Sequence, residues 1–151
     1  MDLAGLPAKI AIPTRQTLSG AKLKAVIFDW DLTLWNSWDI HLWLMGKTAD
    51  DLGLPRPDKG EIAREYSRPF LEHLAWFFGE EQGRILDSYI GHYRETVSEM
   101  AGLYPGITET LTDFKGHGLK LGIFSDKREP FGISELEQTG VGHLLDHTSF
   151  L

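Results

Sequence analysis

The chain has 151 residues, of which 42% are hydrophobic and 25% charged, a composition typical of a soluble globular unit with a buried hydrophobic core. Fifteen basic and twenty-two acidic residues give a formal charge of −7, so we expect no binding to nucleic acid or to an anionic membrane surface. The sequence contains no cysteine, which excludes disulfides, zinc–thiolate sites and thiol catalysis and fits a cytoplasmic protein.

The first twenty residues contain short apolar pieces that Pro7, Pro13 and Gly20 interrupt. They lack the continuous apolar stretch of a signal peptide, and we predict a flexible lead-in over residues 1–20. Regular structure is therefore expected to begin near residue 21.

The first strand signal is the short apolar run Lys24–Phe28. By periodicity alone this run is either a buried parallel strand or part of a buried helix. The polar residues that follow it, Asp29 to Thr33, favour the strand, because polar side chains follow buried strands at the carboxyl edge of an open α/β sheet.

Helical periodicity then extends from Asn36 to about Met100. Caps and helix breakers divide this span into four helices: one that begins after Ser37 and stops at Gly53, one that begins after Asp58, one over Phe70–Phe78, and one from about Glu80 to Met100. We predict a separate helical unit here.

Strand signals return after this span. A helix marked by Ile107, Leu111 and Phe114 precedes a second apolar run, Leu119–Phe124, which ends in Ser125. A further helix is predicted over 130–138 and a third strand over 148–150. Strands that alternate with helices in this way predict an α/β fold with a parallel sheet.

Asp29 and Asp31 stand one residue apart at the end of the first strand. Because strand side chains alternate, both carboxylates project to the same side and share one site. Two like charges so close imply either a shared proton or a divalent cation such as Mg²⁺. The structural alternative is a pair of turn or helix-capping aspartates.

A wider pattern surrounds this pair. The segment Phe28–Ser37 resembles motif I, D-x-D-x-T, of the haloacid dehalogenase (HAD) superfamily, and Leu121–Lys127 resembles the strand that ends in the phosphate-binding serine of that family. The turn Leu103–Ile107 resembles the return from its helical cap. The resemblance implies a partial Rossmann-like core at 21–35 and 101–151, with an inserted α-helical cap at 36–100, as in phosphoglycolate-phosphatase-like members.

The same resemblance implies a Mg²⁺-dependent phosphatase that hydrolyses a small phosphorylated metabolite through an aspartyl-phosphate intermediate. Asp29 would be the nucleophile and a Mg²⁺ ligand, and Asp31 the general acid/base that offers its backbone carbonyl to the metal. Thr33 would fix motif I, and Ser125 would hydrogen-bond the phosphoryl oxygens. An aspartate at position 31 favours phosphatases over the dehalogenases of the superfamily, which do not use one there.

Two elements of the family pattern lie beyond its second motif: a lysine that neutralises the phosphoryl group and an acidic motif that completes the Mg²⁺ shell. We expect both to be missing here. Lys127 is a candidate substitute for this lysine, although a lysine at such a position is more often a solvated loop residue. For Asp146 we expect a solvated turn aspartate rather than a ligand.

These gaps leave two hypotheses open. The chain is either a truncated enzyme or a degenerate member that binds a partner without catalysis. A sheet that lacks its last strands would leave an uncovered edge, so we expect self-association through that edge.

Arg68 precedes Pro69 at a break between two predicted helices and resembles the substrate-facing cap loop of related phosphatases. An arginine there would bind a phosphate or carboxylate of the substrate. The alternative is a surface arginine that stacks beside Pro69 or pairs with Glu65 or Glu72.

Overall fold

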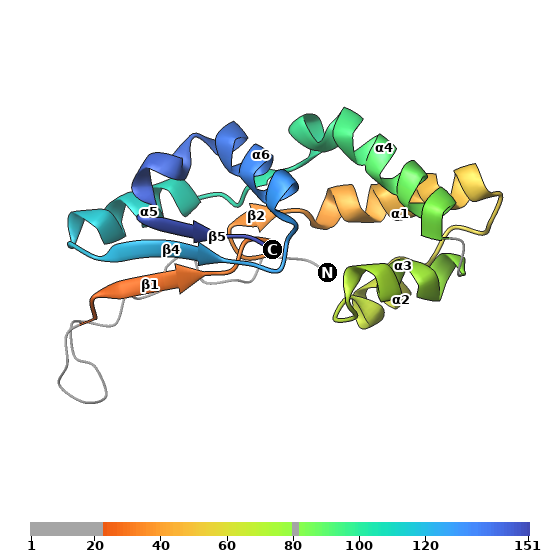
Figure 1. The fold of residues 1–151 in the computed structure, drawn as a ribbon, viewed down its shortest axis with the longest axis horizontal. Helices are drawn as coiled ribbons and strands as arrows, with labels where there is room; N and C mark the ends of the chain where they lie inside the picture. The colour runs from red at the N-terminus through yellow and green to blue at the C-terminus, as the bar shows by residue number, and fades with distance from the viewer. Residues whose placement is uncertain (1–22, 80–81) are drawn as a thin grey trace.

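The computed structural model describes residues 23–79 and 82–151, so the predicted lead-in at 1–20 lies outside the described residues. Its sheet has three parallel strands in the order β1 (Ala25–Phe28), β4 (Lys120–Phe124) and β5 (His147–Ser149). Two crossover connections with helices join the strands (Figure 1). The α/β fold with a parallel sheet is therefore confirmed.

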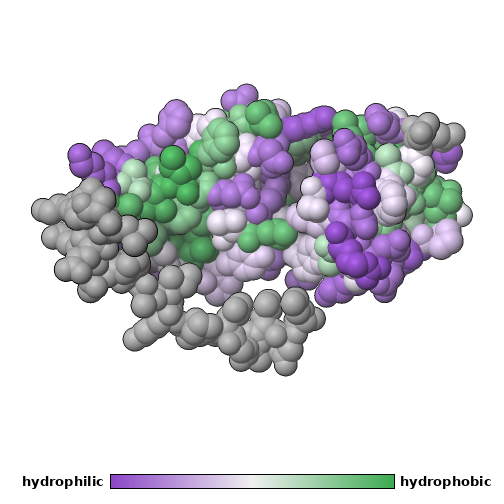
Figure 2. All heavy atoms as spheres, turned by 90° about the horizontal axis from the view of Figure 1, so that it is seen from below, coloured by the Kyte–Doolittle hydropathy of each residue, from purple (hydrophilic) through white to green (hydrophobic). Residues whose placement is uncertain are grey.

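One face of the sheet is covered by α5 (Ile107–Gly116), α6 (Glu129–Thr139) and a 3-10 helix (Val141–Leu144). Leu111, Leu121 and Val141 form the buried centre of this layer. Because strand side chains alternate, Ile27 and Phe124 point to the other face, where they are 72% and 69% exposed. Figure 2 shows hydrophobic side chains gathered on the surface of the half that contains the sheet.

The other half of the molecule consists of four helices (Figure 1). They are α1 (Trp38–Leu52), α2 (Lys59–Glu65), α3 (Phe70–Phe78) and α4 (Gln82–Met100). Helices α1 and α4 pack side by side through buried residues that include Ile40, Leu44 and Ile85. The division of the chain at residues 36 and 100 stays a prediction, although the regular structure described between residues 38 and 100 is helical.

Several helix ends follow the predicted signals. Asp58 caps α2, where its carboxylate accepts the N–H groups of Gly60 and Glu61 at 2.9 and 3.2 Å. Gly53 ends α1 in the left-handed conformation, with φ of 68°. Ser37 occupies the N-cap position of α1 as predicted, but its side chain makes no capping hydrogen bond.

Two short strands, β2 (Trp35–Asn36) and β3 (Gly102–Leu103), were not predicted. They pair antiparallel, with Trp35 opposite Leu103, and so join the two points where the chain enters and leaves the helical half. Two-residue strands carry no readable periodicity, which explains why the sequence did not reveal them.

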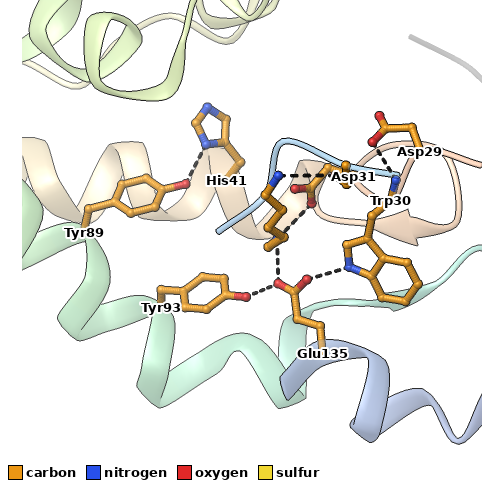
Figure 3. A network of polar contacts seen from close by, with 9 residues as sticks. Asp29, Trp30, Asp31, His41, Tyr89, Tyr93 and Glu135 are labelled. Carbon is orange, nitrogen blue, oxygen red and sulfur yellow. Dashed lines mark hydrogen bonds and ion pairs between the residues drawn. The ribbon is translucent and has the colours of Figure 1, made fainter. Parts of the chain in front are cut away.

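The helical half contains a buried chain of hydrogen bonds that joins three of its helices. The Nδ1–H group of His73 donates to the Glu65 carbonyl at 3.0 Å, so His73 Nε2 must accept from His41 Nε2–H at 3.2 Å. His41 Nδ1 in turn accepts from the Tyr89 hydroxyl at 2.7 Å (Figure 3). Two neutral imidazole rings satisfy all of these contacts, whereas protonation of both rings would leave the His41–His73 hydrogen bond without an acceptor.

Within the described residues, no helix is long and apolar enough to cross a membrane.

The histidine chain predicts a loss of stability in acid. Burial, with a smaller contribution from His73, lowers the pKa of His41 from 6.5 to about 3, and burial also lowers the pKa of His73. Below pH 6.5 the unfolded chain binds a proton at His41 that the folded chain does not, so the free energy of unfolding falls with pH by about 1.4 kcal/mol per unit towards pH 3. Urea unfolding followed between about pH 7.5 and pH 5 measures this slope.

The matched variants are His41→Gln and His147→Gln, the second at an exposed position. We expect His41→Gln to be less stable at neutral pH and to have a flatter pH dependence, whereas His147→Gln keeps the original slope. Equal slopes in all three proteins would contradict the assignment.

Candidate active site

Asp29 and Asp31 line the same cavity, of about 850 Å³, at the carboxyl end of β1. The carboxylate of Asp29 is oriented by the backbone N–H of Trp30, which donates to Oδ1 at 2.7 Å. The Asp31 side chain is 28% exposed. Both predicted carboxylates therefore reach one solvent-accessible space.

A tight turn holds this pair in place. The Trp30 carbonyl accepts the N–H groups of Thr33, Leu34 and Trp35 at 3.0–3.3 Å. Leu32 has φ of 57°, a left-handed conformation that a leucine rarely adopts, and its N–H donates to the Trp35 carbonyl at 2.9 Å. Thr33 thus takes part in the turn through its backbone, and its predicted role in fixing motif I stays a prediction.

Trp30 projects away from the carboxylates and into the core. Its ring is fully buried, stacks on Trp35 with centroids 5.7 Å apart, and meets the edge of Phe150 at 6.1 Å. The base of the turn is therefore anchored by aromatic packing, and the carboxylates stand on a rigid support.

Ser125 follows β4 directly, and β4 pairs with β1 in parallel, so Asp29 and Ser125 lie at the ends of adjacent strands as predicted. Ser125 is 4% exposed, its N–H donates to the Ser149 carbonyl at 3.0 Å, and its Oγ accepts from the N–H of Lys127 at 3.4 Å. It is not among the described residues that line the cavity.

Lys127 is not a solvated loop residue. Its side chain is 13% exposed, and its ammonium lies 3.0 Å from Asp31 Oδ1 and 2.7 Å from Glu135 Oε1. The structure therefore brings a largely buried cation into contact with the Asp31 carboxylate of motif I. It has this position because the loop after β4 passes over the end of β1.

Glu135 was not singled out by the sequence. It is 1% exposed, accepts the Trp30 indole N–H at 2.7 Å and is hydrogen-bonded by the Tyr93 hydroxyl (Figure 3). Burial raises the pKa of Glu135, whereas Lys127 acts in the opposite direction. A glutamate in an amphipathic helix is usually solvated, so only its spacing of three from the inward-facing Gly132 hints at burial.

Arg68 lines the cavity but has protein partners. Its Nε donates to Glu65 Oε2 at 2.7 Å, and its guanidinium lies over the ring of Trp76, 4.2 Å from the centroid. Of the two acidic neighbours considered from the sequence, Glu65 is the one it contacts. Binding of a substrate by Arg68 stays a prediction.

Asp146 lies away from the cavity. It pairs with the ammonium groups of Lys115 and Lys120 at 2.8 and 2.9 Å and accepts the Leu121 N–H at 2.9 Å. The lysines and this backbone group hold the pKa of Asp146 well below its usual range. The residue thus joins α5 to the sheet rather than standing free in a turn.

The oxygen donors of the site suit Mg²⁺. The ion prefers hard oxygen ligands and keeps several waters, so one or two protein carboxylates suffice. Asp29 supplies one such carboxylate, and Asp31 and Asp126 line the same cavity. The described residues contain no group of three or more side chains placed to hold a metal, so waters or substrate oxygens would complete the shell.

Solved structures share the fold. A predicted phosphoglycolate phosphatase from Haemophilus somnus superposes with a TM-score of 0.73 at 20% identity, over 85% of this chain and 62% of that chain. A haloacid dehalogenase-like hydrolase from Streptococcus pneumoniae gives 0.74 at 21% identity, over 85% and 61%. Protein Tyrosine Kinase A from Mycobacterium tuberculosis gives 0.75 at 25% identity, over 85% and 60%. The chain thus spans about three-fifths of these proteins.

A search of curated proteins gave no match. The family model for haloacid dehalogenase-like hydrolases matches residues 26–149, which include both carboxylates, the serine after β4 and the helical span between them. The chain therefore belongs to the haloacid dehalogenase-like hydrolase family.

Proposed function

We propose that this chain carries the nucleophile-bearing part of a Mg²⁺-dependent phosphatase that hydrolyses a small phosphorylated metabolite. One observation carries the proposal: Asp29, Asp31 and the ammonium of Lys127 meet at one cavity at the carboxyl edge of the parallel sheet. Phosphoryl transfer depends on the positioning of a nucleophile and on neutralisation of charge, and this arrangement supports both.

The reaction would proceed in two steps. An oxygen of Asp29 attacks phosphorus, and the bond to the leaving oxygen breaks while Asp31 donates a proton to that oxygen. Water then attacks the aspartyl phosphate, Asp31 accepts its proton, and Asp29 and inorganic phosphate are released. Asp31 is protonated at the start of the first step and serves as an acid. It is deprotonated at the start of the second step and serves as a base.

The charge of the phosphoryl group requires cations and donors. Asp29 and the backbone carbonyl of Asp31 would hold Mg²⁺, which when bound supplies electrostatic stabilisation of the phosphoryl oxygens. Lys127 supplies a further positive charge, and the Ser125 hydroxyl is proposed to donate to a phosphoryl oxygen once the substrate is bound.

Residues of the helical half line much of the cavity, among them Tyr66, Phe70 and Tyr89. Walls of this kind exclude water from the reacting centre and select the leaving group. Burial, with a further contribution from Asp31, raises the pKa of Tyr66 to about 12, so its hydroxyl stays protonated at neutral pH. A cytoplasmic location is proposed with this function, supported by the absence of cysteine.

The second candidate is an interaction module without catalysis that self-associates through the sheet face that carries the exposed side chains of Ile27 and Phe124. It is supported by the exposure of Ile27 and Phe124 on one face and by the position of β1 at the sheet edge. An exposed apolar face that includes an edge strand favours association with another chain, here a second copy.

Asp29→Asn should lower the turnover of a small aryl phosphate in the presence of Mg²⁺ by about a thousandfold or more, because the amide is a poor nucleophile. Asp31→Asn should also be strongly impaired, and removal of Mg²⁺ by a chelator should abolish the activity of the unaltered protein. Asp113→Asn, an exposed change on α5, is the matched control and should retain full activity. No Mg²⁺-dependent turnover by the unaltered chain would favour the second candidate, and unchanged turnover by Asp29→Asn would contradict the phosphatase proposal.

Arg68→Ala should lower kcat/KM for the physiological substrate by about tenfold if the guanidinium binds it, and change activity towards a small aryl phosphate little. Arg64→Ala, at an exposed position of α2, controls for the loss of charge. Equal losses on both substrates would indicate a folding defect, and no loss on either would leave Arg68 with its contacts to Glu65 and Trp76 alone.

Ile27→Lys should shift the protein towards the monomer in sedimentation velocity over a range of concentrations, because a charge opposes burial of that face. Ile133→Lys changes a partly exposed isoleucine of α6 and should leave the distribution unchanged. A monomer at every concentration before substitution would exclude this mode of self-association.

A further inference from the structure

The ammonium of Lys127 is held more closely by Glu135 than by Asp31. The nitrogen lies 2.7 Å from Glu135 Oε1 and 3.0 Å from Asp31 Oδ1, and a lysine side chain ordinarily moves freely on its four-carbon stem. A second carboxylate in contact with the ammonium limits the freedom of the lysine side chain. An ammonium has three donors, so one remains to face a phosphoryl oxygen.

Glu135 is itself held on both oxygens. Oε2 accepts the Trp30 indole N–H at 2.7 Å, and Oε1 accepts the Tyr93 hydroxyl as well as the ammonium. Figure 3 shows Trp30 and Tyr93 reaching this carboxylate from opposite sides. The carboxylate therefore has little freedom to follow Lys127 if the lysine moves.

A buried carboxylate at this place has a cost. Removal of a carboxylate from water is unfavourable, and an apolar side chain of similar size would pack on the inner face of α6 without that cost. Close packing around Trp30 is already provided: at Gly132 an added Cβ would lie 2.4 Å from the ring of Phe150, so the glycine admits this ring against Trp30. Packing alone therefore does not explain a carboxylate at position 135.

The contacts of Glu135 join three distant parts of the chain. Trp30 belongs to the turn after β1, Lys127 and Glu135 to the loop after β4 and to α6, and Tyr93 to α4 in the helical half. Burial, with a smaller contribution from Glu135, raises the pKa of Tyr93, so its hydroxyl remains a donor at neutral pH. The position of α4 therefore affects the group that holds the lysine.

We propose that Glu135 is a positioning residue that anchors the Lys127 ammonium beside Asp31. Tyr93 makes this anchoring depend on the docking of α4 against α6. The role of the anchored ammonium rests on the proposed phosphatase function, whereas the anchoring itself does not.

The anchoring is tested by the reactivity of the Lys127 amine towards a small acylating reagent, followed residue by residue by mass spectrometry of the full chain. Exposed Lys59 is the internal reference. In the unaltered protein Lys127 should react about tenfold more slowly than Lys59, and Glu135→Gln should remove most of this protection. Glu137→Gln, an exposed change of the same kind on the same helix, should have no effect.

Tyr93→Phe removes one hydroxyl and keeps the ring, so it should give a smaller rise in Lys127 reactivity. This variant decides the question if Glu135→Gln does not fold, which would appear as a rise at every lysine. Unprotected Lys127 in the unaltered protein, or protection that survives both substitutions while the reactivity of Lys59 stays constant, would overturn the proposal.

The catalytic consequence is read from a double-mutant cycle with an aryl phosphate and Mg²⁺. Glu135→Gln should lower kcat about tenfold with a smaller change in KM, and should have no further effect in a Lys127→Met background, because it acts through the lysine. Additive losses would overturn the link to Lys127. A lack of turnover by the unaltered protein would count against the phosphatase function and not against the anchoring, which the labelling decides.

Discussion

The parallel pairing of β1 with β4 is the constraint on which the site depends. The register places Phe28 opposite Ile123, so the next residues of both strands emerge at the same edge of the sheet. Asp29 follows one strand and Ser125 the other, although nearly a hundred positions separate them in the sequence. Parallel strands are joined by a long crossover, and here that crossover contains the helical span. Residues of the span line the cavity at the same edge of the sheet.

Buried polar networks flank the cavity on two sides. In the helical half, His41, His73 and Tyr89 form a neutral chain whose donors and acceptors all match. Beneath the carboxylates, Glu135 and Lys127 form a charged pair, and the Trp30 indole N–H donates to the other oxygen of Glu135. Unpaired polar groups in a low-dielectric interior are costly, so each network holds its helices in one arrangement and not in a range of similar ones.

The helices and strands followed local signals closely. Asp58 and Gly53 act through hydrogen bonds and backbone conformations that involve only nearby residues, and the helix predicted at Phe70–Phe78 has the same bounds in the structure. Where the strands were short, as in the pairing of Trp35 with Leu103, they contained too few residues for a periodicity to be detected. Ser37 occupies its predicted position without the expected hydrogen bond, because residue type does not fix the rotamer of a side chain inside a packed core.

Strand alternation and motif spacing are local properties of the chain, so they were enough to predict the α/β class and to point to Asp29, Asp31 and Ser125 at the ends of two strands. Contacts between distant segments, which no local signal predicts, bring the largely buried Lys127 to Asp31 and to Glu135. These contacts join a loop, two helices and a turn that are far apart in the sequence. A lysine or a glutamate has the same local preferences whether it is solvated or paired in the interior, and only the packing of distant segments removes the water that would otherwise surround it.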